Sequence, residues 1–229
     1  MKTCLLFLFI LLNSTFKVNA QGGSFAIKSA AEKVDKVLDR KTGSILSEKQ
    51  LQELFSKHPN IVLDYEITKY GTKENLSYHS DSIRTGAFNR LSKYPALKVG
   101  EQVHKFVFET LNGEKFASED LKGKYVIIAF DLMPKGRFVN TKILTDLDNQ
   151  IELLDTKENV AAFACFMERD KSQFDELQLT NLHIVPGSSL FLERFGMSST
   201  PKIIVFDTAG NLITTYGISD KIDLKSIIE

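Results

Sequence analysis

Residues 125–144 read YVIIAFDLMPKGRFVNTKIL and contain an apolar run, a polar loop and the start of an amphipathic pattern. A continuous apolar run is typical of a strand that lies inside a parallel sheet and is buried on both faces. Downstream, apolar residues recur at helical spacing: Ile143, Leu144, Leu147, Ile151 and Leu154. We therefore predict a strand, a loop and a helix over residues 141–155, with Asn140 as a helix cap.

The pattern continues on both sides of this stretch. Asn112-Gly113 between two short apolar runs predicts a hairpin over residues 106–118, followed by a helical turn that Ser118 caps. Further strands are predicted at 159–167, 182–185, 201–207 and 212–218, and further helices at 172–179, 188–197 and 221–229. Strand–helix–strand units followed by an antiparallel hairpin and a helix predict an α/β sandwich with a mixed sheet.

Two segments carry a resemblance to a known family: VGEQVHKFVFETLNGEKFASEDLKGKYVIIAF (99–130) and FGMSSTPKIIVFDTAGNLITTYG (195–217). They resemble the exported thioredoxin-like proteins of the TlpA and redoxin (alkyl hydroperoxide reductase) type, over roughly residues 97–229. The resemblance implies a three-layer sandwich with a mixed sheet. It also implies that the Thr200–Pro201 bond is cis and faces the active site.

The loop after the first strand departs from that family. The Cys-x-x-Cys motif of the family falls on Lys135, Gly136, Arg137 and Phe138, none of which can form a disulfide. The Thr-x-x-Cys motif of a peroxiredoxin is also absent there. The catalytic residues of the family therefore do not carry over, and we predict no catalytic residue at this degenerate position.

Lys135 and Arg137 precede a helix start, where a cation costs about 0.3 to 1 kcal/mol. The loop either projects into water or, with Thr200 and Pro201, forms a binding site for an anion or an acidic peptide. A third possibility is that Arg137 pairs with a nearby acid such as Asp131.

Cys165 lies in the apolar run AAFACFM, so we interpret it as a small hydrophobic residue of a buried strand. The alternative is an enzyme that uses the Cys165 thiol together with a thiol of a partner protein. The four histidines show no metal-ligand spacing to one another or to Cys165. We accordingly expect neither a metal nor a cofactor.

The first 20 residues have the pattern of a secretory signal peptide: basic Met1-Lys2, an apolar run over residues 4–12, and small residues at Val18 and Ala20. An uncleaved anchor is the rival interpretation. Cleavage removes Cys4 and leaves Cys165 as the single cysteine. We expect export to the periplasm or outside the cell, and no transmembrane segment in the mature chain.

Residues 21–96 form a predicted N-terminal extension, mostly helical, ahead of a thioredoxin-like domain at 97–229. We expect a helix over 24–40 and a second that begins at a capping box of Ser47 and Gln50 and ends before Pro59. A strand at 61–67 and a long loop from 68 to 95, lying against the following domain, complete it. This segment resembles the extra N-terminal region of some redoxin-domain proteins of the Bacteroidetes group.

The sequence as a whole favours a redox-inactive binding or scaffold protein over the Cys165-dependent oxidoreductase or peroxidase. Its expected partner is an extended peptide or another exported protein, bound beside Pro201 by strand-like backbone pairing. A net charge of zero argues against a nucleic-acid partner, which would require a strong basic excess.

Overall fold

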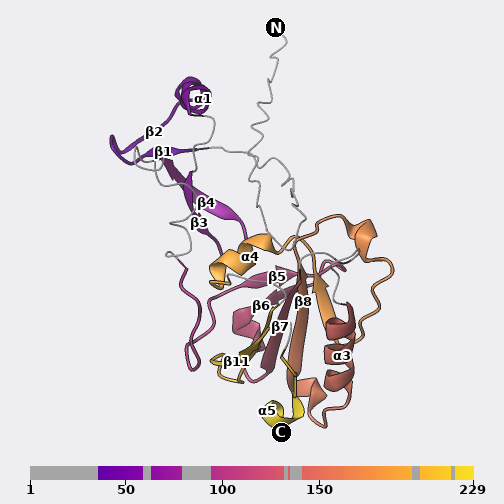
Figure 1. The fold of residues 1–229 in the computed structure, drawn as a ribbon. Coiled ribbons are helices and arrows are strands. Elements are labelled where there is room, and N and C mark those ends of the chain that lie inside the picture. Colours follow the sequence, from indigo (N-terminus) through magenta and orange to yellow (C-terminus); the bar gives the residue numbers. More distant parts are fainter. Residues whose placement is uncertain are drawn as a thin grey trace. The chain divides into compact units, whose positions relative to one another are not determined.

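The structure is a computed structural model of the 229-residue chain (Figure 1). It describes residues 36–58, 63–78, 94–131, 134, 141–197, 202–217 and 220–229. The chain divides into two compact units. The smaller comprises Met1–Tyr65 and Asn75–Gly86, and the larger comprises Glu66–Glu74 and Ala87–Glu229. The predicted signal peptide lies outside the described residues.

The larger unit is built on a five-stranded mixed sheet in the order β11-β10-β7-β8-β9. Strands β7, β8 and β9 are mutually parallel, whereas β10 is antiparallel to both β7 and β11. This order and these directions confirm the predicted thioredoxin-like α/β sandwich. The strands of the sheet are β7 (Tyr125–Asp131), β8 (Val160–Phe166), β9 (Leu182–Val185), β10 (Lys202–Phe206) and β11 (Leu212–Tyr216).

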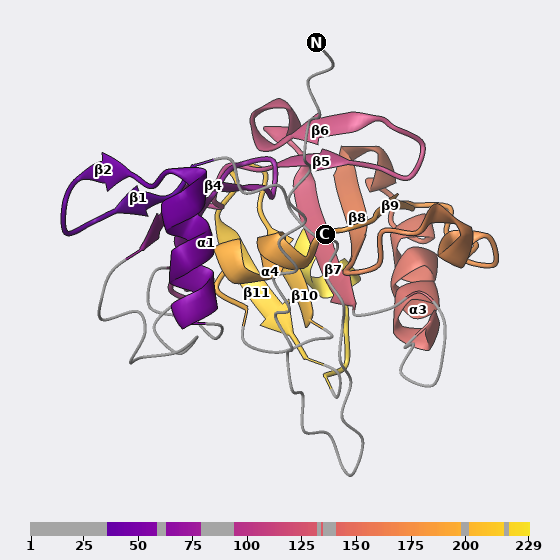
Figure 2. The same ribbon diagram turned by 90° about the horizontal axis from the view of Figure 1, so that it is seen from above.

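Separate elements cover the two faces of this sheet and make three layers. The β5–β6 hairpin and α4 pack on one face, and α3 and α5 pack on the other. Figure 2 shows the hairpin and α3 on separate sides of β7 and β8. The covering elements are β5 (Val107–Glu109), β6 (Lys115–Ala117), α3 (Thr141–Glu152), α4 (Ser189–Arg194) and α5 (Lys225–Ile228).

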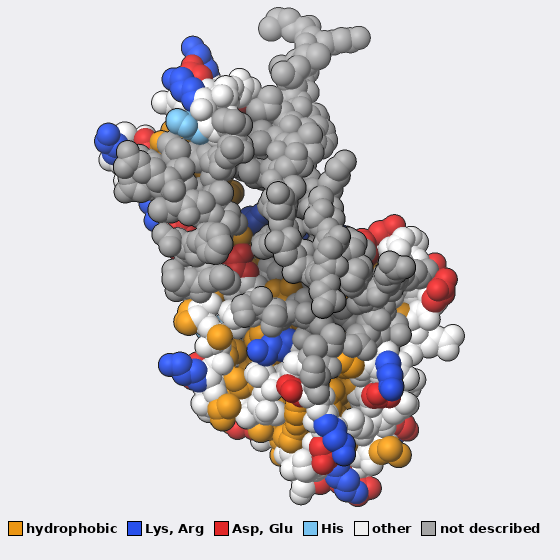
Figure 3. Space-filling model, in the orientation of Figure 1, with side chains coloured by type: hydrophobic (Ala, Val, Ile, Leu, Met, Phe, Trp, Pro, Cys, Tyr) orange, Lys and Arg blue, Asp and Glu red, His pale blue; other side chains and the backbone are white. Residues whose placement is uncertain are grey.

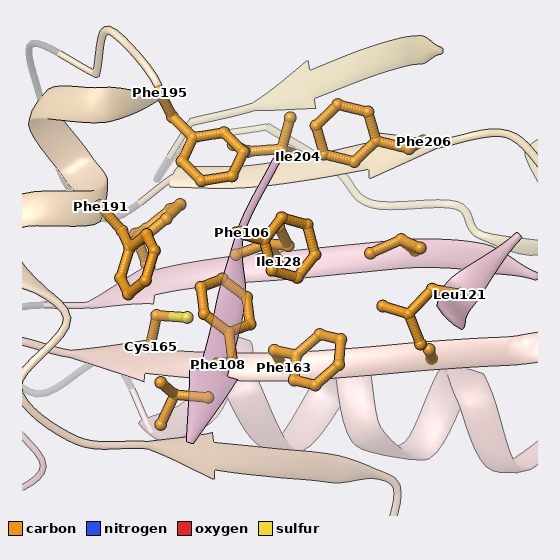
Figure 4. Packing of buried hydrophobic residues seen from close by; sticks show 14 of the residues in the cluster. Phe106, Phe108, Leu121, Ile128, Phe163, Cys165, Phe191, Phe195, Ile204 and Phe206 are labelled. Carbon is orange, nitrogen blue, oxygen red and sulfur yellow. The ribbon is translucent and has the colours of Figure 1, made fainter. Parts of the chain in front are cut away.

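The side-chain alternation of a strand explains why β7 is apolar from Tyr125 to Phe130, ahead of its last residue, Asp131. Val126, Ile128 and Phe130 belong to the core beneath the hairpin and α4, whereas Ile127 and Ala129 belong to the core beneath α3. Figure 4 shows the first core, in which phenylalanine rings from β5, β8, α4 and β10 gather around Ile128. Both cores are closed by one sheet, which fixes the register of its strands.

The predicted hairpin and the helix after β7 are confirmed. Strands β5 and β6 pair antiparallel around a turn in which Gly113 has φ +85°, a conformation that favours glycine. Helix α3 buries Leu144, Leu147 and Ile151 as the periodicity predicts. It is shorter than expected, because it ends at Glu152 rather than at residue 155.

The smaller unit differs from the mostly helical extension that we expected. Its described part contains one α-helix, α1 (Glu48–Lys57), and strands of a four-stranded sheet in the order β2-β1-β4-β3. The capping box of Ser47 and Gln50 is confirmed at the start of α1. The strands are β1 (Leu38–Asp39), β2 (Ser44–Ile45), β3 (Asp64–Ile67) and β4 (Lys73–Tyr78). Residues 66–74, which include the turn between β3 and β4, belong to the larger unit.

Two predictions were wrong in this region. The helix expected up to residue 40 cannot include Leu38, which pairs with Ile45 and Ser77 across two strands. At Leu38, cross-strand pairing overrides the helical periodicity of residues 24–40. Residues 24–35 of that expected helix lie outside the described part of the chain. Strand β4 replaces part of the expected long loop: Leu76 and Tyr78 lie against a small core, and the buried Ser77 between them pairs with Leu38 of β1.

Two shorter predictions in the larger unit also need correction. The helix expected over residues 172–179 is only a 3-10 turn, Lys171–Phe174, which buries Phe174 in the core beneath α3. Ser118 does not cap the following turn but lies inside it. Its hydroxyl instead accepts a hydrogen bond from the backbone N–H of Phe106.

Candidate functional site

The candidate site lies at the edge of the sheet where β7 ends and β10 begins. Phe130 on β7 pairs with Lys202 on one side and with Cys165 on the other. This edge holds the carboxyl ends of the parallel strands, where ligands bind in open α/β sheets. The sheet thus places the start of β10 beside the end of β7, because neighbouring strands of a sheet lie about 5 Å apart.

The four residues predicted to bind a ligand lie outside the described part of the chain: Lys135, Arg137, Thr200 and Pro201. Gly136 and Phe138, which complete the degenerate Cys-x-x-Cys position, lie outside it as well. Their described flanks do come together, because Asp131 ends β7 and Lys202 begins β10 at the same edge. The cis conformation of the Thr200–Pro201 bond stays a prediction. The pairing of Arg137 with Asp131 also stays untested.

Lys202 is a residue of this edge that the sequence analysis did not single out. Its side chain points to the same face of the sheet as Phe130, its partner in register, and it is half-buried. No carboxylate of the described residues forms an ion pair with its ammonium group. A half-buried cation that no described carboxylate pairs with is suited to receive an anionic group. Its position next to the predicted Pro201 site was the signal in the sequence.

Cys165 is fully buried, with an exposed fraction of 0%. Figure 4 shows its sulfur among the phenylalanine and aliphatic side chains of the core. Burial raises the pKa of the Cys165 thiol well above its ordinary value, and a hydrogen bond with Ser188 acts in the opposite direction. The thiolate, which is the reactive form, is therefore strongly disfavoured, as the interpretation of Cys165 as a core residue expects.

Asp148 on α3 is a second residue that the sequence analysis missed. The residue is 8% exposed, and its carboxylate accepts hydrogen bonds from the backbone N–H groups of Thr180, Asn181 and Leu182, at 3.0, 2.7 and 3.1 Å. These bonds tie the start of β9 to α3. The signal in the sequence is an acidic residue directly after Leu147 on the apolar stripe of the helix.

The described residues contain no group of three or more His, Cys, Asp or Glu side chains that could hold a metal ion. None of their helices is long and apolar enough to span a bilayer. Figure 3 shows basic and acidic side chains interspersed on one face of these residues, without a continuous basic surface.

Comparisons with known proteins give no family assignment: no family model matches the chain, and no curated protein matches it. Solved structures do match. The thioredoxin domain of a thiol-disulfide oxidoreductase from Bacteroides vulgatus is 20% identical, with 52% of this chain and 89% of that chain covered and a TM-score of 0.44.

Two further structures have similar values. A SCO1/SenC family lipoprotein from Bacillus anthracis is 17% identical, covers 58% of this chain and 95% of its own, and has a TM-score of 0.46. A thiol peroxidase from Chromobacterium violaceum is 15% identical, with 58% and 85% covered and a TM-score of 0.46. The fold of this chain is assigned from its own strand order and register as thioredoxin-like.

Proposed function

We propose that the protein is an exported binding or scaffold protein that has a thioredoxin-like fold and performs no thiol-disulfide chemistry. The observation that carries this proposal is the state of Cys165. It is the single cysteine left after the predicted signal peptide, and it is fully buried with a raised thiol pKa. The Cys-x-x-Cys position of the family reads Lys-Gly-Arg-Phe at 135–138. One inaccessible thiol cannot complete a dithiol cycle within the chain.

The proposed ligand is an extended acidic peptide or an acidic segment of another exported protein. It would pair with the backbone beside Thr200 and Pro201 and place carboxylates near Lys135 and Arg137. Two observations support this placement. The described flanks of both segments lie on neighbouring strands, and Lys202 adds a half-buried ammonium group without an ion-pair partner among the described residues.

A reduced and carboxymethylated polypeptide is a suitable probe because it is extended, acidic and free of thiols. We expect it to bind the full chain, with an affinity that falls as salt rises, because exposed charges are screened over about 8 Å at physiological ionic strength. The double change Lys135→Ala and Arg137→Ala should weaken binding and leave the melting temperature unchanged.

Lys142→Ala is the matched control, because Lys142 is an exposed cation of α3. It should leave the binding of the probe as in the wild type. A failure of the wild-type protein to bind the probe at low salt would contradict the proposal. A loss of stability without a loss of binding in the double variant would show that the two cations only tie down the loop.

A further inference from the structure

Residues 66–74, which contain the turn of the β3–β4 hairpin, belong to the larger unit. Gly71 in this turn lies against Phe191 of α4. Arg194, the last residue of α4, donates through Nε to the carbonyl oxygen of Lys105 at 3.1 Å. A terminal nitrogen of the same guanidinium donates to the carbonyl oxygen of Ile67. One side chain therefore joins the end of α4 to the hairpin turn and to the residues before β5.

Backbone groups of the turn are also engaged. The N–H of Ile67 donates to the hydroxyl oxygen of Tyr94 at 2.7 Å, and the carbonyl oxygen of Lys69 accepts from the N–H of Val107 at 2.7 Å. The second bond occupies a donor on the outer edge of β5. Both bonds hold the turn at two points separate from Arg194.

Gly71 at the tip of the turn makes the closest approach. It has φ +66°, and a Cβ atom added there would lie 2.5 Å from Cε2 of Phe191. Phe191 is a buried residue of α4 whose ring stands at right angles to that of Phe108, 4.8 Å away between centroids. Only a residue without a side chain fits between the turn and this ring.

A second segment holds the residues directly after α4. Gly196 has φ +66°, and a Cβ atom added there would lie 2.5 Å from the backbone of Pro95 and Ala96. The described chain continues to Met197 and resumes at Lys202, the start of β10. The residues held by these contacts therefore lead directly to the predicted binding residues Thr200 and Pro201.

We propose that residues 66–74 are a positioning strap for the binding site: they hold the end of α4, and through it they set the position from which the chain enters Thr200 and Pro201. Gly71 and Arg194 are its positioning residues. The strap itself rests on contacts among described residues. Its effect on a ligand rests on the proposed function.

Gly71→Ala in the full chain tests the strap, with Gly123→Ala as the matched control. Gly123 also has a positive φ, +87°, but a Cβ atom there would meet nothing within 4 Å. Amide hydrogen exchange reports the contacts directly. Gly71→Ala should speed exchange about tenfold at Val107 and at residues 195–197, whereas Gly123→Ala should change these rates less than about threefold.

Binding of the carboxymethylated polypeptide is the second readout. Gly71→Ala should weaken it about fivefold or more at a temperature where the variant is folded, and Gly123→Ala should not. If Gly71→Ala does not fold, Arg194→Lys takes its place, because a lysine cannot bond both carbonyl groups in the fork geometry of arginine.

The two proposals fail in different ways. Faster exchange at residues 195–197 in Gly71→Ala, with no binding of the probe by any form of the protein, sinks the proposed function and leaves the strap in place. Exchange at residues 195–197 that equals the wild-type rate overturns the strap. Faster exchange at residues 195–197 in Gly71→Ala, combined with wild-type affinity for the carboxymethylated polypeptide, also overturns the strap as a positioning device.

Discussion

The guanidinium of Arg194 donates a hydrogen bond to the carbonyl oxygen of Ile67, 127 positions earlier in the chain. Its second acceptor is the carbonyl oxygen of Lys105, so both partners are neutral backbone groups. A planar fork of donors suits two such acceptors, and an ammonium group on a flexible stem does not.

Arg194→Lys should therefore lower the free energy of unfolding by about 1.5 to 3 kcal/mol, the range for hydrogen bonds to charged groups. Chemical denaturation of the full chain measures this loss. Arg169→Lys is the control, because Arg169 is exposed and its guanidinium has no hydrogen bond to a described residue. Equal losses in both variants would mean that the two carbonyl contacts of Arg194 contribute nothing specific.

Asp148→Asn should destabilise the protein by about 2 kcal/mol. The two carboxylate oxygens of Asp148 accept three backbone N–H groups, whereas an asparagine amide offers one acceptor oxygen and turns its own donors toward the remaining N–H. Asp146→Asn, at an exposed position of the same helix, should change the melting temperature little. A wild-type melting temperature for Asp148→Asn would contradict the role assigned to its carboxylate.

Cys165 should react slowly with a thiol reagent in the native protein and rapidly after denaturation. Its side chain has no exposed surface and its thiol pKa is raised, so a reagent meets it only when the core opens. The labelling rate under native conditions, followed by mass spectrometry, measures this. Native labelling as fast as that of the denatured chain would favour the single-thiol enzyme.

The purified protein should not reduce insulin disulfides with dithiothreitol above the uncatalysed rate. The physical reason is the missing dithiol, since Lys135 and Phe138 stand where the two cysteines of the family would be. Turnover that Cys165→Ser abolishes would establish the enzyme instead. Turnover that survives Cys165→Ser would place the chemistry at a residue other than a cysteine.

Acidification should destabilise the protein through His104. Burial, and then the positive charge of Arg194, lower the pKa of His104 below its ordinary value of 6.5, although Glu101 acts in the opposite direction. The unfolded chain therefore takes up a proton first as pH falls. Stability contributed by neutral His104 is present above pH 6.5 and is lost as pH falls toward the lower pKa of the folded state.

Equilibrium denaturation between about pH 7.5 and 5 tests this, because that window spans the ordinary histidine range. His104→Gln should flatten the pH dependence, whereas His58→Gln, at the end of α1, should leave the His104 component in place. An unchanged slope in His104→Gln would show that other groups carry the acid sensitivity.

The sequence by itself determined the elements whose signal is local. The run at 125–130 is apolar at every position because both faces of β7 are buried, and Asn112-Gly113 specifies its hairpin through backbone conformation. The capping box at Ser47 and Gln50 is equally local. The degenerate Cys-x-x-Cys position is a matter of residue identity, so it needed no coordinates.

Only the tertiary structure decided features that depend on partners far along the chain. Leu38 is in a strand because Ile45 and Ser77 pair with it, and Gly71 is confined because Phe191 lies against it. Asp148 can be buried because three backbone N–H groups of another segment donate hydrogen bonds to its carboxylate and offset the free-energy cost of removing it from water. Such contacts join residues that no local periodicity relates, and long-range packing outweighs intrinsic propensity where the two disagree.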